Sequence, residues 1–409
     1  MKYRGKVTVL LTTLVLATVC LWYINDNGEQ NVAINTSGVR FFTAATLAKS
    51  KSFCTDLGTN YLKPEWDFRR YERPKFLTNY KNPCYLGRRM TNNESLVEGR
   101  ALHCLPYFIV AGFPKSGTTD LWARLFNHAE IHIKHGKEPR FFNIGRFTAP
   151  FERVMVQYIR MFARSTIELQ KLVAPLDCGH EFPYHHGITG EATVDASFDI
   201  KDWRQVPGNE NCSEPAFTNA DVAYHLNPNM KIIFVVRNPV DRAYSDYIYE
   251  ARFLRYPTNP QLFHAAVIDA MRNHTGCWRH HHSVRACAYN NTIESMKVRL
   301  RVGMYHIFIQ DWIDVFSSDN ILVIKAEDTM GPPKIADVYN RIFSFLSVRP
   351  FTRMEEMEVF QRGPVNVRSK HEKNIGEMLP ETRKMLESFY RPFNEALRKL
   401  IPEIDYNAS

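Results

Sequence analysis

A glycine- and threonine-rich segment, Gly112–Thr119, places a lysine among residues that can bind an anion. It follows the apolar run Leu105–Gly112, which is typical of a buried parallel strand, and a helix is expected over residues 118–127. Backbone N–H groups at such a strand-to-helix turn form an anion site together with nearby hydroxyls and a lysine. The residues expected to hold the anion are Lys115, Ser116, Gly117, Thr118 and Thr119.

The order of residues in this segment differs from the phosphate-binding loop of nucleotide-hydrolysing enzymes. That loop requires Gly, four residues and then Gly-Lys-Ser/Thr, whereas Thr118 occupies the lysine position here and the lysine is Lys115. Those enzymes also use an aspartate near a later strand end to hold magnesium. The next apolar strand, expected over 231–236, ends in Arg237 instead. The sequence therefore predicts a nucleotide with two separate anionic ends and no metal.

Arg237 and Ser245 form the second expected anion site. Pro239 follows Arg237 closely and favours the start of a helix, expected over 240–253. Arginine binds a phosphate through two parallel hydrogen bonds, and a serine hydroxyl about two turns along the helix can add a third. Alone, Ser245 would be an ordinary helix serine, but beside Arg237 it is expected to complete a phosphate site.

Both segments resemble the sulfotransferases that use 3′-phosphoadenosine 5′-phosphosulfate. In that family Pro-Lys-Ser-Gly-Thr-Thr contacts the 5′-phosphosulfate and Arg-x-Pro-x-x-Arg-x-x-Ser contacts the 3′-phosphate, and both motifs stand in this chain. The resemblance covers roughly residues 104–400 and implies this donor as the co-substrate. It also implies a P-loop-like sulfotransferase fold of the α/β class, with a mainly parallel sheet between helices.

Within that family, the chain most resembles the Golgi branch that 6-O-sulfates N-acetylgalactosamine 4-sulfate in chondroitin or dermatan sulfate. The resemblance lies in Lys137–Phe142, in Val284–Asn290 and in residues 378–394. It implies an acidic glycosaminoglycan as the acceptor. Heparan sulfate or another glycan is the alternative acceptor, and a membrane-anchored glycan-binding protein without catalysis is the alternative of a different class.

Glu138 is the expected general base. Its motif resembles the Glu-x-x-Phe-Phe of the heparan sulfate branch, in which that glutamate is the base, while an ion pair with Lys137 or Arg140 is the structural alternative. Lys115 is the expected catalytic cation, because sulfuryl transfer, like phosphoryl transfer, builds charge on the leaving oxygen.

Two other residues are candidate bases. His135 is one, since histidine titrates in the right range and serves this role in cytosolic family members. Glu191 is the other, in a region where the heparan branch carries Glu-Lys-Ser/Thr. Ala192 replaces that lysine here, which leaves any role of a second lysine unsupported.

Several residues are weaker candidates for ligand contacts. In relatives a late basic loop closes over the nucleotide, which points to Arg368 and Lys370 as donor contacts. Trp203 and Tyr247 are candidates for stacking on the donor, with core packing as the commoner fate of such aromatics. A basic cluster that binds the acceptor, or is simply a solvated loop, contains Arg279, His281 and Arg285.

The N-terminus indicates a membrane anchor. Three basic residues lie within 1–6 and precede an uncharged apolar run over 7–24, which places the tail in the cytosol and the following chain in the lumen. A cleaved signal peptide is the alternative, but its apolar region is usually shorter. We expect a single-pass type II protein of the Golgi membrane, with a stem over 25–103, a catalytic domain over 104–400 and a short tail over 401–409. Packing of the aromatic-rich stretch Tyr61–Tyr80 on the catalytic body is the alternative for that part of the stem.

Sequons and cysteines agree with a lumenal address. The sequons begin at Asn35, Asn93, Asn211, Asn273, Asn290 and Asn407. Cys277 and Cys287 are expected to close a short disulfide loop, and Cys178 with Cys212 a longer one. A zinc site near 277–287 is the alternative, although no Cys-x-x-Cys spacing supports it.

Composition agrees with this reading. The chain has 409 residues, 44% of them hydrophobic, which is ordinary for a globular protein, and it carries a net charge of +9. A basic balance favours an anionic partner, and the lumenal address argues against nucleic acid. A homodimer is left open. Helices are also expected over 305–316, 335–346 and 380–400, and a strand over 321–324.

Overall fold

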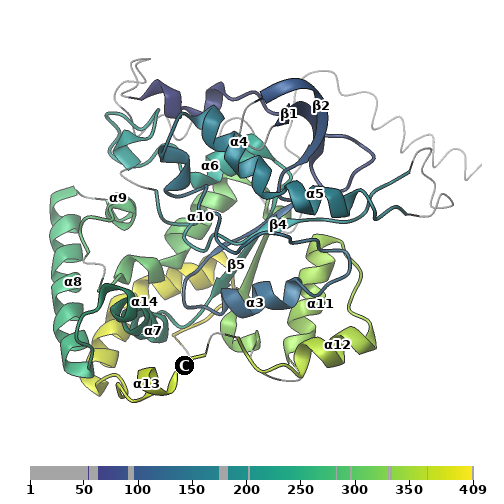
Figure 1. The fold of residues 1–409 in the computed structure, drawn as a ribbon. Coiled ribbons are helices and arrows are strands. Elements are labelled where there is room, and N and C mark those ends of the chain that lie inside the picture. Colours follow the sequence, from purple (N-terminus) through teal and green to yellow (C-terminus); the bar gives the residue numbers. More distant parts are fainter. Residues whose placement is uncertain are drawn as a thin grey trace, which may run out of the picture. The chain divides into compact units, whose positions relative to one another are not determined.

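Four parallel strands form the central sheet of this protein, for which we analysed a computed structural model (Figure 1). The structure describes Cys54 and residues 63–90, 96–174, 183–200, 203–281, 283–294, 297–329, 331, 334–365 and 367–407. The strands are β3 (Phe108–Gly112), β4 (Gly190–Glu191), β5 (Lys231–Val236) and β6 (Ile321–Lys325), in the order β4-β3-β5-β6. The three expected strands are confirmed, and the short β4 was not expected from the sequence.

Alternate residues of the strands serve two separate cores. Ile232 and Phe234 of β5 point into the larger core, whereas Ile233 and Val235 point into the smaller one, because successive strand side chains face opposite sides of a sheet. Both faces are covered by helices, which explains why β5 is apolar after Lys231. The prediction of an α/β fold with a parallel sheet between helices is confirmed.

Helices cover the two faces unequally. The smaller core contains residues of α3, α11 and α12, and the larger core contains residues of helices that include α7, α8, α10 and α14. In Figure 1, α3, α11 and α12 lie together on one side of the strands, with α7, α8 and α14 on the other. The helices are α3 (Thr118–Leu125), α4 (Phe151–Met161), α5 (Ala163–Leu169), α6 (Asn219–Leu226), α7 (Pro239–Leu254), α8 (Pro260–His281), α9 (Val284–Tyr289), α10 (Tyr305–Val315), α11 (Lys334–Leu346), α12 (Arg353–Phe360), α13 (Lys370–Lys373) and α14 (Pro380–Leu400).

The connections after β3 and β5 leave the sheet toward opposite faces. The chain passes from β3 into α3, which packs in the smaller core, and from β5 into α7, which packs in the larger one. Because β3 and β5 are neighbours in the sheet, a crevice opens between the two connections at the carboxyl ends of the strands. Such a topological switch point is the usual ligand site of an open α/β sheet.

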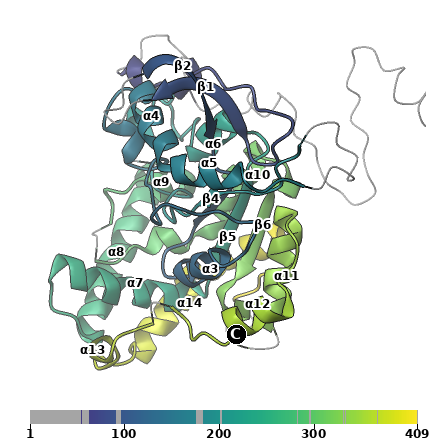
Figure 2. The ribbon, with the colours of Figure 1, turned by 45° about the vertical axis from the view of Figure 1, so that its right-hand side comes forward.

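The region before β3 contains more regular structure than the sequence suggested. Strands β1 (Cys84–Met90) and β2 (Leu96–Cys104) form an antiparallel hairpin, closed by a disulfide between Cys84 and Cys104. The hairpin lies at the end of the described body far from α13 (Figure 2). Trp66 and Phe68 are buried in the larger core. The stem is therefore not irregular from residue 63 onward, and the alternative that its aromatic stretch packs on the body is confirmed for these two residues.

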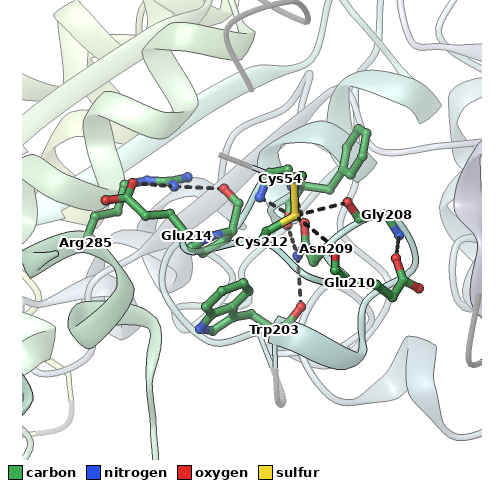
Figure 3. Close-up of a disulfide and its surroundings, with 11 residues drawn as sticks. Cys54, Trp203, Gly208, Asn209, Glu210, Cys212, Glu214 and Arg285 are labelled. Atoms are coloured by element: carbon green, nitrogen blue, oxygen red, sulfur yellow. Dashed lines mark hydrogen bonds and ion pairs between the residues drawn. A yellow bond between two sulfur atoms is a disulfide. The ribbon is translucent and has the colours of Figure 1, made fainter. Parts of the chain in front are cut away.

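A second disulfide corrects one predicted cysteine pair. Cys212 bonds to Cys54 and not to Cys178, which lies outside the described residues (Figure 3). Beside this bridge, the amide of Asn209 donates to the carbonyl of Trp203 at 2.9 Å, which fixes the turn that carries Cys212. The pairing joins positions 158 residues apart, a separation that no local pattern reveals.

The disulfide between Cys277 and Cys287 is present, as their short separation predicted. Both sulfurs are consumed by this bond, so these cysteines cannot ligate zinc. At the C-terminal end, Ile404 and Tyr406 are buried in the larger core, so the expected tail packs on the body. No helix among the described residues is long and apolar enough to span a bilayer, and the expected anchor at 7–24 lies outside those residues.

Candidate active site

The loop between β3 and α3 has the backbone conformation of an anion-binding turn. Gly117 caps the N-terminus of α3 at φ 85°, in the left-handed region that glycine adopts without strain. Lys115 also has a positive φ of 64°, so consecutive N–H groups of this loop form a concave turn. The loop residues Lys115, Ser116, Gly117, Thr118 and Thr119 all line one cleft of about 1660 Å³.

Arg237 and Ser245 face the same cleft from the next strand and helix. The side chain of Asn238 caps α7 by accepting hydrogen bonds from the N–H groups of Val240 at 3.0 Å and Asp241 at 3.4 Å. The Arg237 guanidinium donates to the carbonyl of Lys115 at 3.2 Å. This bond joins the two predicted anion sites directly across the switch point.

A third cation completes this end of the cleft. Arg368 lies with its guanidinium 5.5 Å from the ring centroid of Tyr244 on α7. Burial lowers the pKa of Lys115; the charges of Asp246 and Glu372 oppose this, while those of Arg237 and Arg368 lower it further. Burial and the charge of Arg237 likewise lower the pKa of Arg368. Three cations line this end of the cleft together with the carboxylates of Asp241, Asp246 and Glu372, and an anionic ligand would be attracted to the cations.

A buried ion pair fastens the loop that carries Arg368. Asp120 on α3 accepts a hydrogen bond from the Val365 N–H at 2.9 Å and pairs with Arg124 at 2.7 Å. Arg124 in turn donates to the carbonyls of Val359 at 2.5 Å and Arg362 at 3.3 Å. The late basic loop is thus attached to the helix that follows the Lys115 loop. The sequence did not indicate this contact, because its partners are far apart in the chain.

Glu138 lies in the cleft with its backbone in the left-handed region. It has a positive φ of 64°, as does Arg140 at 59°, and its side chain is 30% exposed. Its carboxylate pairs with Lys137 at 2.5 Å, and Arg140 approaches at 4.0 Å. The expected ion pairs therefore exist, and the side chain nevertheless faces the cleft.

A chain of hydrogen bonds holds the loop that contains Glu138. The N–H of Arg140 donates to the Thr193 hydroxyl at 3.1 Å, and that hydroxyl donates to Glu191 at 2.7 Å. Glu191 is completely buried, and burial raises its pKa to about 8. It is not among the described residues that line the cleft, so its position fits a support of the site better than a base.

His135, the other candidate base, is also held away from the cleft. Its Nε2 lies 3.0 Å from the carbonyl of Gly190 and its Nδ1 lies 2.9 Å from that of Gly136. Burial lowers its pKa. It is not among the described residues of the cleft lining, and the prediction of His135 as a base is corrected by these contacts.

Asp195 is a cleft residue that the sequence did not reveal. Its Oδ2 accepts a hydrogen bond from the Asn143 amide at 2.7 Å, and its Oδ1 has no hydrogen-bond partner among the described residues. Burial raises its pKa to about 6, and the charges of Asp199 and Glu138 act in the same direction. A second carboxyl group therefore lies near Glu138, with its charged form disfavoured.

Comparison with known proteins agrees with this geometry. The model of the sulfotransferase domain matches residues 105–388. The chain belongs to the sulfotransferase family. Its match begins close to residue 104, where the catalytic domain was expected to start, and it includes both the Lys115 loop and the Arg237 segment.

Named relatives of this sulfotransferase domain act on carbohydrates, as their names state. Carbohydrate sulfotransferase 15 of Homo sapiens is 32% identical over 310 residues, which are 74% of this chain and 54% of that protein. Bifunctional heparan sulfate N-deacetylase/N-sulfotransferase 4 of Mus musculus is 24% identical over 315 residues, 73% of this chain and 30% of that protein. The chain thus spans about half the length of the carbohydrate sulfotransferase it matches.

A solved sulfotransferase structure also aligns with this chain. The crystal structure of the sulfotransferase from Alicyclobacillus acidocaldarius aligns with 73% of this chain and 96% of its own, at 25% sequence identity and a TM-score of 0.43.

Most of the predicted site residues lie together in the cleft of the sulfotransferase domain. They are Lys115, Ser116, Gly117, Thr118, Thr119, Glu138, Arg237, Ser245 and Arg368. Lys370 is exposed at the start of α13 and is not among the described residues of the lining. Its neighbours Ser369 and Glu372 do line the cleft, and a donor contact of Lys370 stays a prediction.

The expected basic acceptor site does not form at the cleft. Arg285 is bound to Asp311 at 2.9 Å. It also pairs with Glu214 at 3.3 Å (Figure 3), so its charge is used within the fold. Arg279 is exposed on α8, and neither arginine is among the described residues of the cleft lining. The side chain of His281 lies outside the described residues. The ion pairs of Arg285 argue against a role in acceptor binding, whereas contact of Arg279 with the acceptor stays a prediction.

The two candidate stacking residues belong to the core. Trp203 and Tyr247 are each 1% exposed, and Tyr247 packs against Phe263 with ring centroids 4.9 Å apart. The core alternative is therefore correct for both. Among the sequons, Asn211, Asn273 and Asn407 are exposed and Asn290 is half-buried, which leaves their modification a prediction. Asn35 and Asn93 lie outside the described residues.

Proposed function

We propose that this protein transfers a sulfuryl group from 3′-phosphoadenosine 5′-phosphosulfate to a hydroxyl group of a glycosaminoglycan. The acceptor we favour is the 6-hydroxyl of N-acetylgalactosamine 4-sulfate in chondroitin or dermatan sulfate. The observation that carries the proposal is the meeting of Lys115, Arg237 and Arg368 in one cleft. Sequence similarity to carbohydrate sulfotransferase 15 supports the choice of acceptor.

The donor end of the cleft would bind the two anionic ends of the nucleotide. The turn at Gly117 and the Lys115 side chain would hold the 5′-phosphosulfate, and Arg237 with Ser245 the 3′-phosphate. Arg368 adds a third positive charge beside them. No metal is needed in this scheme, because the charge that builds on the leaving oxygen is stabilised by Lys115 and backbone N–H groups.

The acceptor end would supply the base. The acceptor oxygen attacks sulfur in line, the bond from sulfur to the 5′-phosphate oxygen breaks, and the hydroxyl proton passes to the carboxylate of Glu138. This carboxylate already faces the cleft. The contact with Lys137 at 2.5 Å orients the carboxylate before the proton arrives.

We also propose the cellular address that the sequence predicted. In this proposal residues 7–24 form a signal-anchor, the protein is a type II protein of the Golgi membrane, and the folded body lies in the lumen. Three disulfides within the body support an oxidising compartment. Exposure of Asn273 on α8 is compatible with a glycan there. Digestion with an N-glycosidase, followed by a shift in electrophoretic mobility, tests this address.

The decisive experiment is transfer of radiolabelled sulfate by the purified full-length protein. Chondroitin, dermatan sulfate and heparan sulfate are offered side by side with an added chelator, and the labelled disaccharides are then identified. We expect label on 4-sulfated N-acetylgalactosamine. Label on heparan sulfate alone would favour the alternative acceptor.

A glycan-binding protein without catalysis is the remaining alternative. It would bind the polymer without transferring label to any acceptor, even though the donor product still binds. Arg237→Ala separates the two functions, because it should weaken nucleotide binding only if the cleft binds a nucleotide. Arg279→Ala is the matched control, since Arg279 is an exposed arginine outside the cleft.

A further inference from the structure

One face of α7 follows the cleft from its donor end outward. Ser245, Tyr249 and Arg252 all line the cleft, and their spacing of four and three residues places them on one face of the helix. From Ser245 to Arg252 the helix advances by roughly 10 Å at 1.5 Å per residue. If Ser245 marks the 3′-phosphate, Arg252 lies well beyond it toward the acceptor.

Tyr249 marks the boundary between the two ends. The Lys115 ammonium group lies 3.8 Å from the centroid of its ring, so the phosphate-binding lysine reaches this point of α7. Burial raises the pKa of the Tyr249 phenol; the charge of Glu138 raises it further, while Arg252 and Arg140 oppose this. Glu138, Arg140 and Arg252 line the same cleft as Tyr249, although they come from two distant segments of the chain.

Most arginines that line the cleft either form ion pairs within the protein or lie at the donor end. Arg124 pairs with Asp120 at 2.7 Å, and Arg299 pairs with Asp246 at 2.5 Å. Two more pairs join Arg362 to Glu358 at 2.5 Å and Arg383 to Asp241 at 2.6 Å. Arg237 and Arg368 lie at the donor end. Of the arginines that line the cleft, Arg140 and Arg252 remain.

Neither of these two has a close acidic partner. The side chain of Arg140 is 56% exposed, and its nearest carboxylate, Glu138, is at 4.0 Å. Arg252 is exposed and has no ion pair or side-chain hydrogen bond to any residue that the structure describes. Two arginines without strong partners therefore line the cleft that also holds the candidate base, where an anion on a bound molecule could meet them. Their planar guanidinium groups suit sulfate and carboxylate oxygens especially well.

We propose that Arg140 and Arg252 form an anion subsite for the acceptor, which binds a sulfate ester or a uronate carboxylate next to the hydroxyl group that is sulfated. The inference rests on the proposed function and adds to it the residues that select a charged acceptor. The subsite would hold an anionic sugar with its free hydroxyl toward Glu138. An uncharged sugar would gain nothing from it, so the two arginines would set specificity rather than catalyse transfer.

The test measures kcat/KM of Arg140→Ala and Arg252→Ala on four acceptors. These are chondroitin 4-sulfate, desulfated chondroitin, carboxyl-reduced chondroitin 4-sulfate, and a chondroitin that has undergone both treatments. We expect a loss of about 10- to 100-fold for each variant on the fully charged polymer. The loss should shrink to less than about 3-fold on whichever polymer lacks the recognised anion. This pattern tells a sulfate ester from a carboxylate.

Three further measurements make the outcome unambiguous. Arg140→Lys and Arg252→Lys should recover part of the loss, since they keep the charge, and Arg391→Ala, at an exposed arginine outside the cleft lining, should match the unaltered protein. Binding of the donor product should be unchanged in both alanine variants. An equal loss on all four acceptors, or no loss on any, overturns the subsite. Absence of transfer by the unaltered protein overturns the proposed function instead, and binding of labelled chondroitin 4-sulfate oligosaccharide then tests the subsite by itself.

Discussion

The two ends of the cleft are built from different kinds of structure. At the donor end, the anion-binding residues directly follow β3 and β5, and glycine or asparagine fixes the start of the next helix. At the acceptor end, Glu138 and Arg140 lie in a loop with positive φ angles, and they are held by side chains of another loop. The donor end is therefore shaped by the sheet, whereas the acceptor end depends on contacts between loops.

The two ends of the cleft also differ in what they are expected to bind: the donor is one fixed molecule, whereas acceptors vary. A nucleotide with fixed phosphate positions suits a rigid turn at a topological switch point. Acceptor sugars differ in charge and linkage, and loops on a rigid scaffold can change without disturbing the sheet. We therefore expect substitutions at the donor end to affect nucleotide binding, and substitutions at the acceptor end to affect turnover or acceptor choice.

Glu138→Gln should have the largest effect. Removing the base is expected to lower kcat by about 10²- to 10⁴-fold, because the amide cannot accept the hydroxyl proton. Binding of the donor product, measured by calorimetry, should change little. The exposed Glu387→Gln is the matched control. Unchanged turnover in Glu138→Gln would refute the assignment of the base. It would also contradict the expectation that substitutions at the acceptor end affect turnover.

Lys115→Ala should come next, with a loss of about 10²- to 10³-fold in kcat. The lysine is expected to stabilise charge on the leaving oxygen, so its removal acts on the transition state more than on binding. Single-turnover rates at saturating donor measure this loss. Lys384→Ala, an exposed lysine outside the cleft lining, serves as the control. A change confined to donor affinity would assign Lys115 to binding alone.

Ser245→Ala and Arg237→Ala should weaken binding of 3′-phosphorylated nucleotide by about 10- to 100-fold with a smaller change in kcat. Each removes a hydrogen bond that is expected to meet the 3′-phosphate. Comparison with a nucleotide that lacks this phosphate sharpens the test, because the variants and the unaltered protein should bind it alike. If the variants lose affinity equally for both nucleotides, the phosphate lies elsewhere.

Asp120→Asn should have a moderate effect, about 10-fold in KM for the donor. The amide can still accept from the Val365 N–H, but the ion pair with Arg124 is lost. The loop carrying Arg368 should then be more susceptible to protease, while kcat is nearly preserved. An equal loss in kcat and stability without a change in KM would show that the pair serves the fold alone.

Glu191→Gln should have the smallest effect on activity and a pH-dependent effect on stability. The pKa of Glu191 is about 8 when folded and lies near the ordinary value of about 4.3 when unfolded. Between these pH values the folded protein binds one more proton at Glu191 than the unfolded chain does. The contribution of Glu191 to the free energy of unfolding therefore falls as the pH rises toward 8. The variant does not titrate, so its free energy of unfolding should exceed that of the unaltered protein increasingly between pH 5 and 8. Thermal unfolding measures the difference, and a constant difference across this range would contradict the burial of an ionisable group.

The sheet and the donor end were predictable from the sequence for a local reason. Apolar runs such as Lys231–Val236 mark strands buried on both faces, and the motif residues follow them directly along the chain. Helical periodicity could also have placed Tyr249 and Arg252 on one face with Ser245, since they follow it at four and seven residues. The hairpin of β1 and β2 was missed because its exposed strands lack a sustained apolar pattern.

Which charged side chains face the cleft was less predictable, because the position of a charged side chain depends on its ion-pair or hydrogen-bond partner. Arg285 stands in a basic run but is held by Asp311, whereas Arg252 stands alone in sequence and remains without an ion pair among the described residues. Asp195 gave no signal either, since its position depends on Asn143 and on the loop of Glu138. Only distances in the folded structure show which charged side chains form ion pairs within the protein and which can contact a ligand.

The sequence by itself determined the α/β class, the family and the two anion-binding segments, because each is encoded in contiguous residues with helical or strand periodicity. The tertiary structure decided that these segments face one another, since the chain leaves β3 and β5 toward opposite faces of the sheet. It also decided the pairing of Cys54 with Cys212, the attachment of the Arg368 loop to Asp120, and the location of Arg140 and Arg252 beside Glu138. These depend on residues brought together from distant parts of the chain, and packing and charge pairing select them only once the fold has formed.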